Sequence, residues 1–183
     1  MSEKEVAIQQ TKKWITDVVI GCNFCPFASR EMKRNAVHFQ VENCFEMKES
    51  LHSFLKECIR LDENQAIETT LLIFPSAWKN FRPYLVLVSK AEMLLKKNGY
   101  EGIYQVAGFH PLYQFADSIA GDAADFTNRS PYPMLHLLRE DRITEALEHF
   151  PHPEKIPSDN TSFAREKGYA FMKMLRQSCL KID

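Results

Sequence analysis

The chain has 183 residues, 45% of them hydrophobic and 26% charged, which is typical of a soluble globular protein. That length suits one ordinary domain, so we expect a single globular domain over residues 1–183. The formal net charge of -1 argues against broad electrostatic capture of nucleic acid or of an anionic membrane. No segment approaches the roughly 20 apolar residues that cross a bilayer, and the charged residues 1–14 do not resemble a secretory signal.

The cysteines indicate a reducing, cytoplasmic environment. Their number is odd, and a chain of this length does not need disulfide bonds to fold. Cys58 and Cys179 fall in amphipathic helical patterns, and Cys44 lies near the start of one, so we interpret these three as buried, unreactive thiols. Cys22 and Cys25 are considered separately below.

The spacing of apolar residues predicts alternating helices and strands. A helix is expected over 3–20 with Gly21 as its end, followed by strands over 36–42, 66–75, 103–111 and 134–140. Helices are expected between the first three strands and after the fourth, and one final helix is expected to begin at Ser158 or Asn160. The prediction is an α/β fold with about four strands in a mixed, largely parallel sheet and helices packed against it. The last two strands, joined by a loop, are expected to break the parallel pattern.

His110 closes the third predicted strand, and ligand sites in open α/β sheets gather beyond such strand ends. It is either a histidine hydrogen-bonded at a strand end or a general base or metal ligand. The segment that follows, 111–133, is long and has no regular pattern, which is typical of functional loops. The alternative is an ordered surface loop held by Asp and Asn hydrogen bonds.

His136 alternates with Met134 and Leu138 on the fourth predicted strand, and a buried histidine is more often structural than catalytic. If a cleft lies over that strand, His136 becomes a partner for His110. Arg139, together with Arg129, would suit a carboxylate or a phosphate; the alternative is that Arg139 pairs with Glu140 or solvent.

Cys22 and Cys25 allow four interpretations. A redox dithiol normally follows a strand, whereas this pair follows a predicted helix. A closed zinc site usually has a second pair of ligands, and the sequence has no second cysteine pair, although a catalytic metal held by Cys25, His110 and His136 stays open. If Pro26 begins a short helix, Cys25 is its N-cap and the helix dipole favours the thiolate. In the fourth interpretation both thiols are core residues.

Four strings, GCNFCPFA, TTLLIFP, QVAGFHPLYQF and TNRSPYPMLHLLRE, resemble an uncharacterised bacterial family, the domain of unknown function 1415. The resemblance extends from Trp14 to the helix after Glu140 and implies no particular activity. The family pattern has an apolar residue where Cys22 stands, which weighs against a dithiol. The polar residues that match the family are Asn23, Cys25, His110, Tyr113, Gln114, Asn128, Arg129, Ser130, Tyr132, His136, Arg139 and Glu140. They come from three segments, which we expect to meet in one pocket.

The leading hypothesis is a small cytoplasmic enzyme that acts on a small anionic molecule. Cys25 would be the nucleophile or a metal ligand, and His110 and His136 would be base, acid or ligands. The residues expected to bind substrate are Asn23, Tyr113, Gln114, Asn128, Arg129, Tyr132, Arg139 and Glu140.

Two alternatives come from other classes of protein. One is a module without catalysis that binds a transition metal, heme or another cofactor through Cys25, His110 and His136. The other is a scaffold whose aromatic loop at 111–133 binds another protein. The expected partner is a small-molecule ligand rather than nucleic acid or a membrane, and the sequence leaves the oligomeric state, the substrate and the reaction open.

Overall fold

The computed structural model describes residues 1–148 and 150–182. Four strands form one sheet: β1 (Val37–Val41), β2 (Thr69–Ile73), β3 (Tyr104–Phe109) and β4 (Met134–Arg139). Their order is β1-β2-β4-β3, with β1 parallel to β2 and β4 antiparallel to both of its neighbours. The mixed four-stranded α/β sheet is therefore confirmed. β1, β2 and β3 point the same way, but only one neighbouring pair is parallel, because β4 is inserted between β2 and β3.

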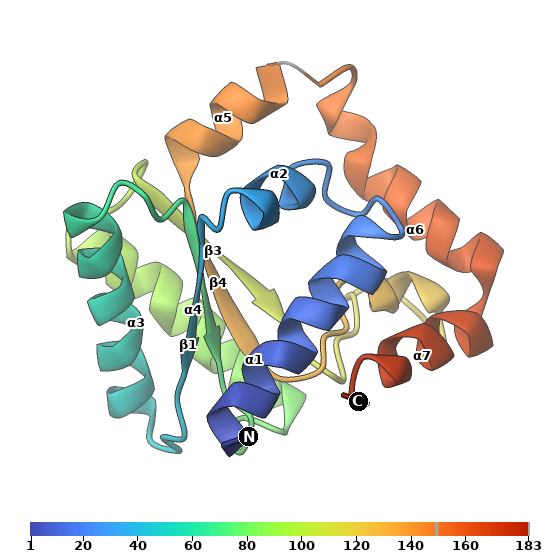
Figure 1. Ribbon diagram of the computed structural model, residues 1–183, viewed down its shortest axis with the longest axis horizontal. Coiled ribbons are helices and arrows are strands. Elements are labelled where there is room, and N and C mark those ends of the chain that lie inside the picture. Colours follow the sequence, from blue (N-terminus) through green and yellow to red (C-terminus); the bar gives the residue numbers. More distant parts are fainter. Residues whose placement is uncertain (149, 183) are drawn as a thin grey trace.

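Two helices cover one face of this sheet, α3 (Met47–Glu63) and α4 (Phe81–Lys97), as Figure 1 shows. Their apolar sides pack on alternate residues of the strands. Phe54 and Leu87 from these helices and Leu72 and Leu135 from the sheet are essentially inaccessible to solvent. Since β2 is buried on both faces, its near-continuous apolar sequence is physically required.

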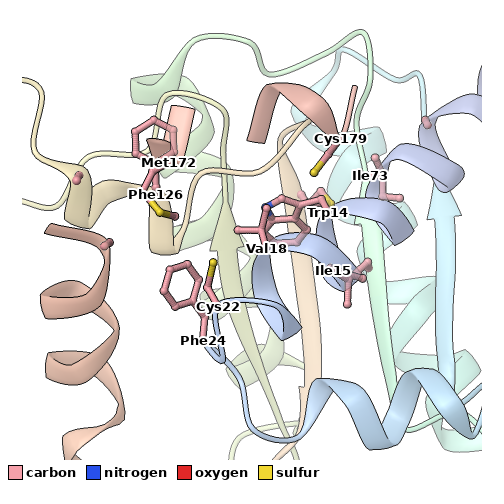
Figure 2. Close-up of a cluster of buried hydrophobic side chains, with 14 of the residues drawn as sticks. Trp14, Ile15, Val18, Cys22, Phe24, Ile73, Phe126, Met172 and Cys179 are labelled. Carbon is pink, nitrogen blue, oxygen red and sulfur yellow. The ribbon is translucent and has the colours of Figure 1, made fainter. Parts of the chain in front are cut away.

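The opposite face is covered only in part, by α1 (Glu3–Trp14), its π-helical continuation η1 (Ile15–Ile20) and the C-terminal helices (Figure 1). Figure 2 shows Trp14 and Val18 in a cluster with Phe126 and Met172. These side chains come from three separate segments, and all are at most 3% exposed. This cluster fixes α1 and η1 against the sheet.

The C-terminal region contains two helices where the sequence pattern predicted one. They are α6 (Ile156–Lys167) and α7 (Tyr169–Ser178), preceded by the short 3-10 helix η3 (Pro153–Lys155). Gly168 separates them with a φ of 83°, a conformation that ends a helix and that glycine adopts without strain. A second 3-10 helix, η2 (Ala123–Thr127), lies within the predicted loop at 111–133 and packs against α6.

Gly21 follows the π-helix at a position where a larger residue would not fit. A Cβ atom at this position would lie 2.3 Å from the carbonyl oxygen of Asp17. The wide turns continue, since the Phe24 N–H donates to the Val19 carbonyl at 2.8 Å. They place Cys22 in the core, with its sulfur among apolar side chains (Figure 2). Cys22 therefore serves as an apolar residue.

Two shorter helices border the part of the sheet that α1 leaves uncovered, α2 (Ala28–Lys33) and α5 (Glu140–Glu148). The prediction that Cys25 is the N-cap of a helix starting at Pro26 is wrong. The Ala28 N–H lies 3.4 Å from the Cys25 carbonyl, so residues 25–28 form a turn, and the helix begins two residues later, with Phe27 as its N-cap. Within the described residues, no helix is long and apolar enough to cross a membrane.

Candidate functional site

A cavity of about 350 Å³ lies on the partly covered face of the sheet. Its floor is formed by all four strands, and its walls come from α1 and η1, from the segment around α2, and from α5. The volume suits a small organic molecule. The lining residues that matter below are Trp14, Cys25, Glu68, Thr69, Gln105, Ala107, Phe109, His136, Arg139 and Arg142.

The inner surface of the cavity is mostly apolar. The rings of Trp14 and Phe109 meet edge to face with centroids 5.2 Å apart, and Phe109 lies 5.9 Å from the ring of His136. Ala107 is directly opposite His136 in the strand pairing, and its methyl group leaves the space above the histidine open. The floor is thus an aromatic surface with one imidazole in it.

His136 is held in one orientation by Thr69. The Thr69 hydroxyl lies 2.6 Å from the Leu137 carbonyl oxygen and 2.7 Å from His136 Nε2. An oxygen–oxygen contact this short requires a proton between the two atoms, so Thr69 donates to Leu137 and accepts from His136. The proton of the neutral imidazole is therefore on Nε2.

The other nitrogen of His136, Nδ1, carries a free lone pair. Among residues 1–148 and 150–182 no group hydrogen-bonds Nδ1. The atom is not fully buried, so it keeps some contact with solvent. Since His136 lines the cavity, Nδ1 is open to it. Burial lowers the pKa of His136 to about 4, so the ring is neutral near pH 7.

Cys25 lines the same cavity as His136, from the turn that precedes α2. Burial raises the pKa of its thiol, and the N–H groups of Phe27 and Ala28 oppose this shift without overcoming it. The expected thiolate at a helix start is therefore not supported. Cys25 contributes a neutral thiol.

His110 lies away from this cavity, on the α4 side of the sheet. Its Nε2 is 2.9 Å from the Trp78 carbonyl oxygen and its Nδ1 accepts the Leu112 N–H at 2.9 Å. Its ring packs against Phe81 and Tyr84, with centroids 5.2 and 4.8 Å away. Both nitrogens are engaged, and burial lowers the pKa of the ring. The structure does not bring His110 to Cys25 as a catalytic base.

Arg139 borders the cavity, but its guanidinium is turned toward the end of α3. It donates to the carbonyl oxygens of Leu61, Asn64 and Ile67 at 2.5, 3.4 and 3.1 Å, and to the Tyr104 hydroxyl at 3.4 Å. Leu61 is in the last turn of α3 and Asn64 is its C-cap, whereas Ile67 lies just beyond the helix. Arg139 therefore caps a helix, and its charge is not presented to a ligand.

Arg129 is also engaged within the protein, in the segment 111–133. Its Nε donates to the Tyr113 carbonyl at 2.8 Å, and a terminal nitrogen lies 3.1 Å from Asp125. The same carboxylate accepts the Phe115 N–H at 3.1 Å, and the guanidinium stacks over Phe126, 4.9 Å from its centroid. This network orders the segment, as the structural alternative anticipated.

The other polar residues expected to bind substrate also lie outside the cavity: Asn23, Tyr113, Gln114, Asn128, Tyr132 and Glu140. Gln114 donates to the Ser118 carbonyl, Asn128 to the Gly108 carbonyl, and Tyr132 to the side chain of Gln10. The prediction that the three family-like segments meet in one pocket is wrong for these residues. Of the matching set, only Cys25, His136 and Arg139 line the cavity.

The charged residues at the mouth of the cavity neutralise one another. Glu68 lies 3.3 Å from Arg142 of α5 and 3.5 Å from Arg34, and Arg142 also meets Glu145 at 3.1 Å. Arg30 is paired with Glu31 at 3.2 Å. The charge of these arginines is therefore offset by neighbouring carboxylates.

No three His, Cys, Asp or Glu side chains in the described part of the chain gather closely enough to hold a metal ion. Cys25, His110 and His136 thus do not form the three-ligand metal site considered from the sequence. The physical reason is that Cys25 and His136 lie on one face of the sheet and His110 on the other, so the three side chains do not meet.

Sequence reasoning missed three floor residues, Thr69, Ala107 and Phe109. A signal for them existed, because alternate residues of a strand share a face. If His136 faces a cleft, its cross-strand neighbours Leu71 and Ala107 must face the same cleft. Finding them required the pairing register, which the sequence pattern alone does not supply.

A mixed four-stranded sheet with helices on both faces and an apolar cavity over one face defines an α/β protein with a small-molecule-sized site. The family described as "Protein of unknown function (DUF1415)" matches residues 6–174, and the chain belongs to that family. A search of curated proteins and a search of solved structures each found no significant match.

Proposed function

We propose that the protein binds a small, mostly apolar molecule in this cavity, with His136 and Cys25 as the polar groups that contact it. The observation that carries the proposal is a cavity of about 350 Å³ whose surface is mostly apolar, although charged side chains such as Glu68 and Arg142 also line it. Ligand sites commonly combine apolar walls with a small number of placed polar groups. The anionic molecule expected from sequence is a poorer fit, because the arginines expected to hold it are engaged elsewhere.

Filling the cavity is expected to weaken binding of a neutral aromatic probe. The variant Ala107→Leu places a larger side chain beside His136, where the methyl group now leaves space. With 2-naphthol as the probe, we expect wild-type binding to be weakened at least about ten-fold by this change, measured by the fluorescence of 2-naphthol.

The matched control is Ala120→Leu, the same substitution at an exposed position that is in no strand and does not line the cavity. It should bind 2-naphthol as the wild type does. Binding by Ala107→Leu at wild-type strength, or no binding by the wild type, would exclude the cavity as the site for such molecules.

A thiol-dependent enzyme is the second candidate, favoured by one observation: Cys25 and His136 line the same cavity. In such an enzyme, the sulfur would add to a carbonyl carbon of the substrate, the C=O π electrons would move to the oxygen, and the thiol proton would pass to His136 Nδ1. His110 would have no part in the step.

The rate at which N-ethylmaleimide alkylates Cys25, followed by peptide mass spectrometry across pH, separates the two candidates. For a binding protein, wild type and His136→Phe should both react slowly at pH 7 and faster at higher pH, because burial raises the pKa of the thiol. An enzyme would show fast alkylation near pH 7 in the wild type that His136→Phe abolishes. Cys58, which is buried and whose pKa is raised to about 12, is the unreactive reference in the same sample.

A further inference from the structure

The polar group in the cavity floor has one defined hydrogen-bonding character. The contacts of the Thr69 hydroxyl, 2.6 Å to the Leu137 carbonyl and 2.7 Å to His136 Nε2, leave the histidine proton on Nε2. His136 Nδ1 is then an acceptor only. A tautomer fixed by a second residue is a common way to define what a histidine recognises.

The surroundings of Nδ1 raise the importance of this acceptor. The rings nearest to His136 are apolar, with Phe109 at 5.9 Å and Trp14 beyond it. Apart from Arg139, which is turned toward the end of α3, the charged residues that line the cavity form ion pairs, such as Glu68 with Arg142 at 3.3 Å. In an apolar environment, a ligand group that cannot hydrogen-bond the acceptor leaves it unsatisfied, which weakens binding.

We propose that the ligand of this cavity has an apolar body with one neutral hydrogen-bond donor, a hydroxyl or an N–H, which donates to His136 Nδ1. The proposal rests on the proposed function, because it assigns the chemistry of the molecule that the cavity binds. A carboxylate at this position is disfavoured, since both of its oxygens would face the lone pair of Nδ1. An ether or a ketone is disfavoured because it offers no proton.

Three naphthalenes of nearly equal size test the proposal. 2-Naphthol carries a donor, 2-methoxynaphthalene has the same ring system without one, and 2-naphthoate is an anion at pH 7. We expect the wild type to bind 2-naphthol about ten-fold more tightly than 2-methoxynaphthalene, and 2-naphthoate more weakly than either. Dissociation constants can be measured by isothermal titration calorimetry.

Two variants assign the preference to His136. His136→Phe keeps a ring in the floor but has no lone pair, so the ten-fold preference should disappear while both neutral probes still bind. Thr69→Val removes the acceptor for Nε2–H and so allows the proton to move to Nδ1. In Thr69→Val the ratio between the affinities for 2-naphthol and 2-methoxynaphthalene should fall below ten-fold. This variant provides a second test if His136→Phe does not fold.

The outcomes separate this proposal from the proposed function. Equal binding of 2-naphthol and 2-methoxynaphthalene by the wild type, with both lost in Ala107→Leu, would retain the cavity and overturn the donor preference. Tighter binding of 2-naphthoate, or an unchanged ten-fold ratio in His136→Phe, would also overturn it. Failure of the wild type to bind any of the three would overturn both proposals.

Discussion

Lowering the pH from 7 to 4 is expected to reduce the free energy of unfolding of the wild type by about 3 kcal/mol more than that of His136→Phe. Burial lowers the pKa of His136 from 6.5 to about 4 in the folded protein. Between these two values the unfolded chain binds a proton that the folded protein does not. The stabilisation is therefore complete above the unfolded pKa and is lost as the pH falls toward the folded pKa.

Urea unfolding at a series of pH values measures this difference. His38 and His110 also have pKa values lowered by burial, but they are present in both proteins and contribute equally to both curves. The comparison therefore isolates His136. Curves that run parallel between pH 7 and pH 4 would show that His136 is not held neutral in the folded protein, and the assignment of Nδ1 as a free acceptor would lose its support.

Replacing Arg139 by methionine is expected to lower the free energy of unfolding by about 3 kcal/mol. The guanidinium is almost fully buried and donates to the carbonyl oxygens of Leu61, Asn64 and Ile67. The Asn64 carbonyl also accepts the Ile67 N–H, so removing the guanidinium takes this donor chiefly from Leu61 and Ile67. Methionine fills part of the space but donates no hydrogen bond. Urea unfolding at neutral pH measures the loss.

Arg142→Met is the matched control, because Arg142 is an exposed arginine whose ion pairs with Glu68 and Glu145 lie at the surface. Such pairs contribute at most about 1 kcal/mol. If Arg139→Met were no more destabilising than Arg142→Met, Arg139 would not be a structural cap and its charge would again be a candidate for ligand binding.

The sequence predicts the fold well where local patterns decide it. The apolar period of 3.6 along residues 3–20 and the β-rich run before Pro75 identify α1 with η1 and β2, because both segments bury one or two complete faces. The position of β4 between β2 and β3 was not predictable, since it depends on pairing between strands far apart in the chain. Gly168 was a local signal for the break between α6 and α7 that the sequence interpretation missed.

The sequence predicts part of the candidate site, and the alternation of side chains along a strand explains the part that it misses. Cys25 and His136 were both selected, and they line one cavity. His110 was placed with them, but it follows Phe109, and successive strand residues point to opposite faces. Since Phe109 contacts Trp14 and His136, His110 must face α4.

Arg129 and Arg139 show a further limit of sequence reasoning. A run of polar residues in a motif can serve a ligand or can satisfy the protein's own carbonyl groups, and the two uses require the same residue types. The guanidinium of Arg139 lies at the C-terminal end of α3. Its contact with Leu61 there joins two residues that are 78 positions apart in the chain. Only the tertiary structure shows that contact, which fully accounts for a buried arginine.

The most direct test of the proposed cavity is a crystal structure of the protein with 2-naphthol. We predict that the naphthalene rings lie between Phe109 and the residues of α2 and α5, with the hydroxyl within hydrogen-bond distance of His136 Nδ1. Naphthol bound elsewhere while this cavity holds only water, or naphthol in the cavity with its hydroxyl turned away from His136, would contradict the account.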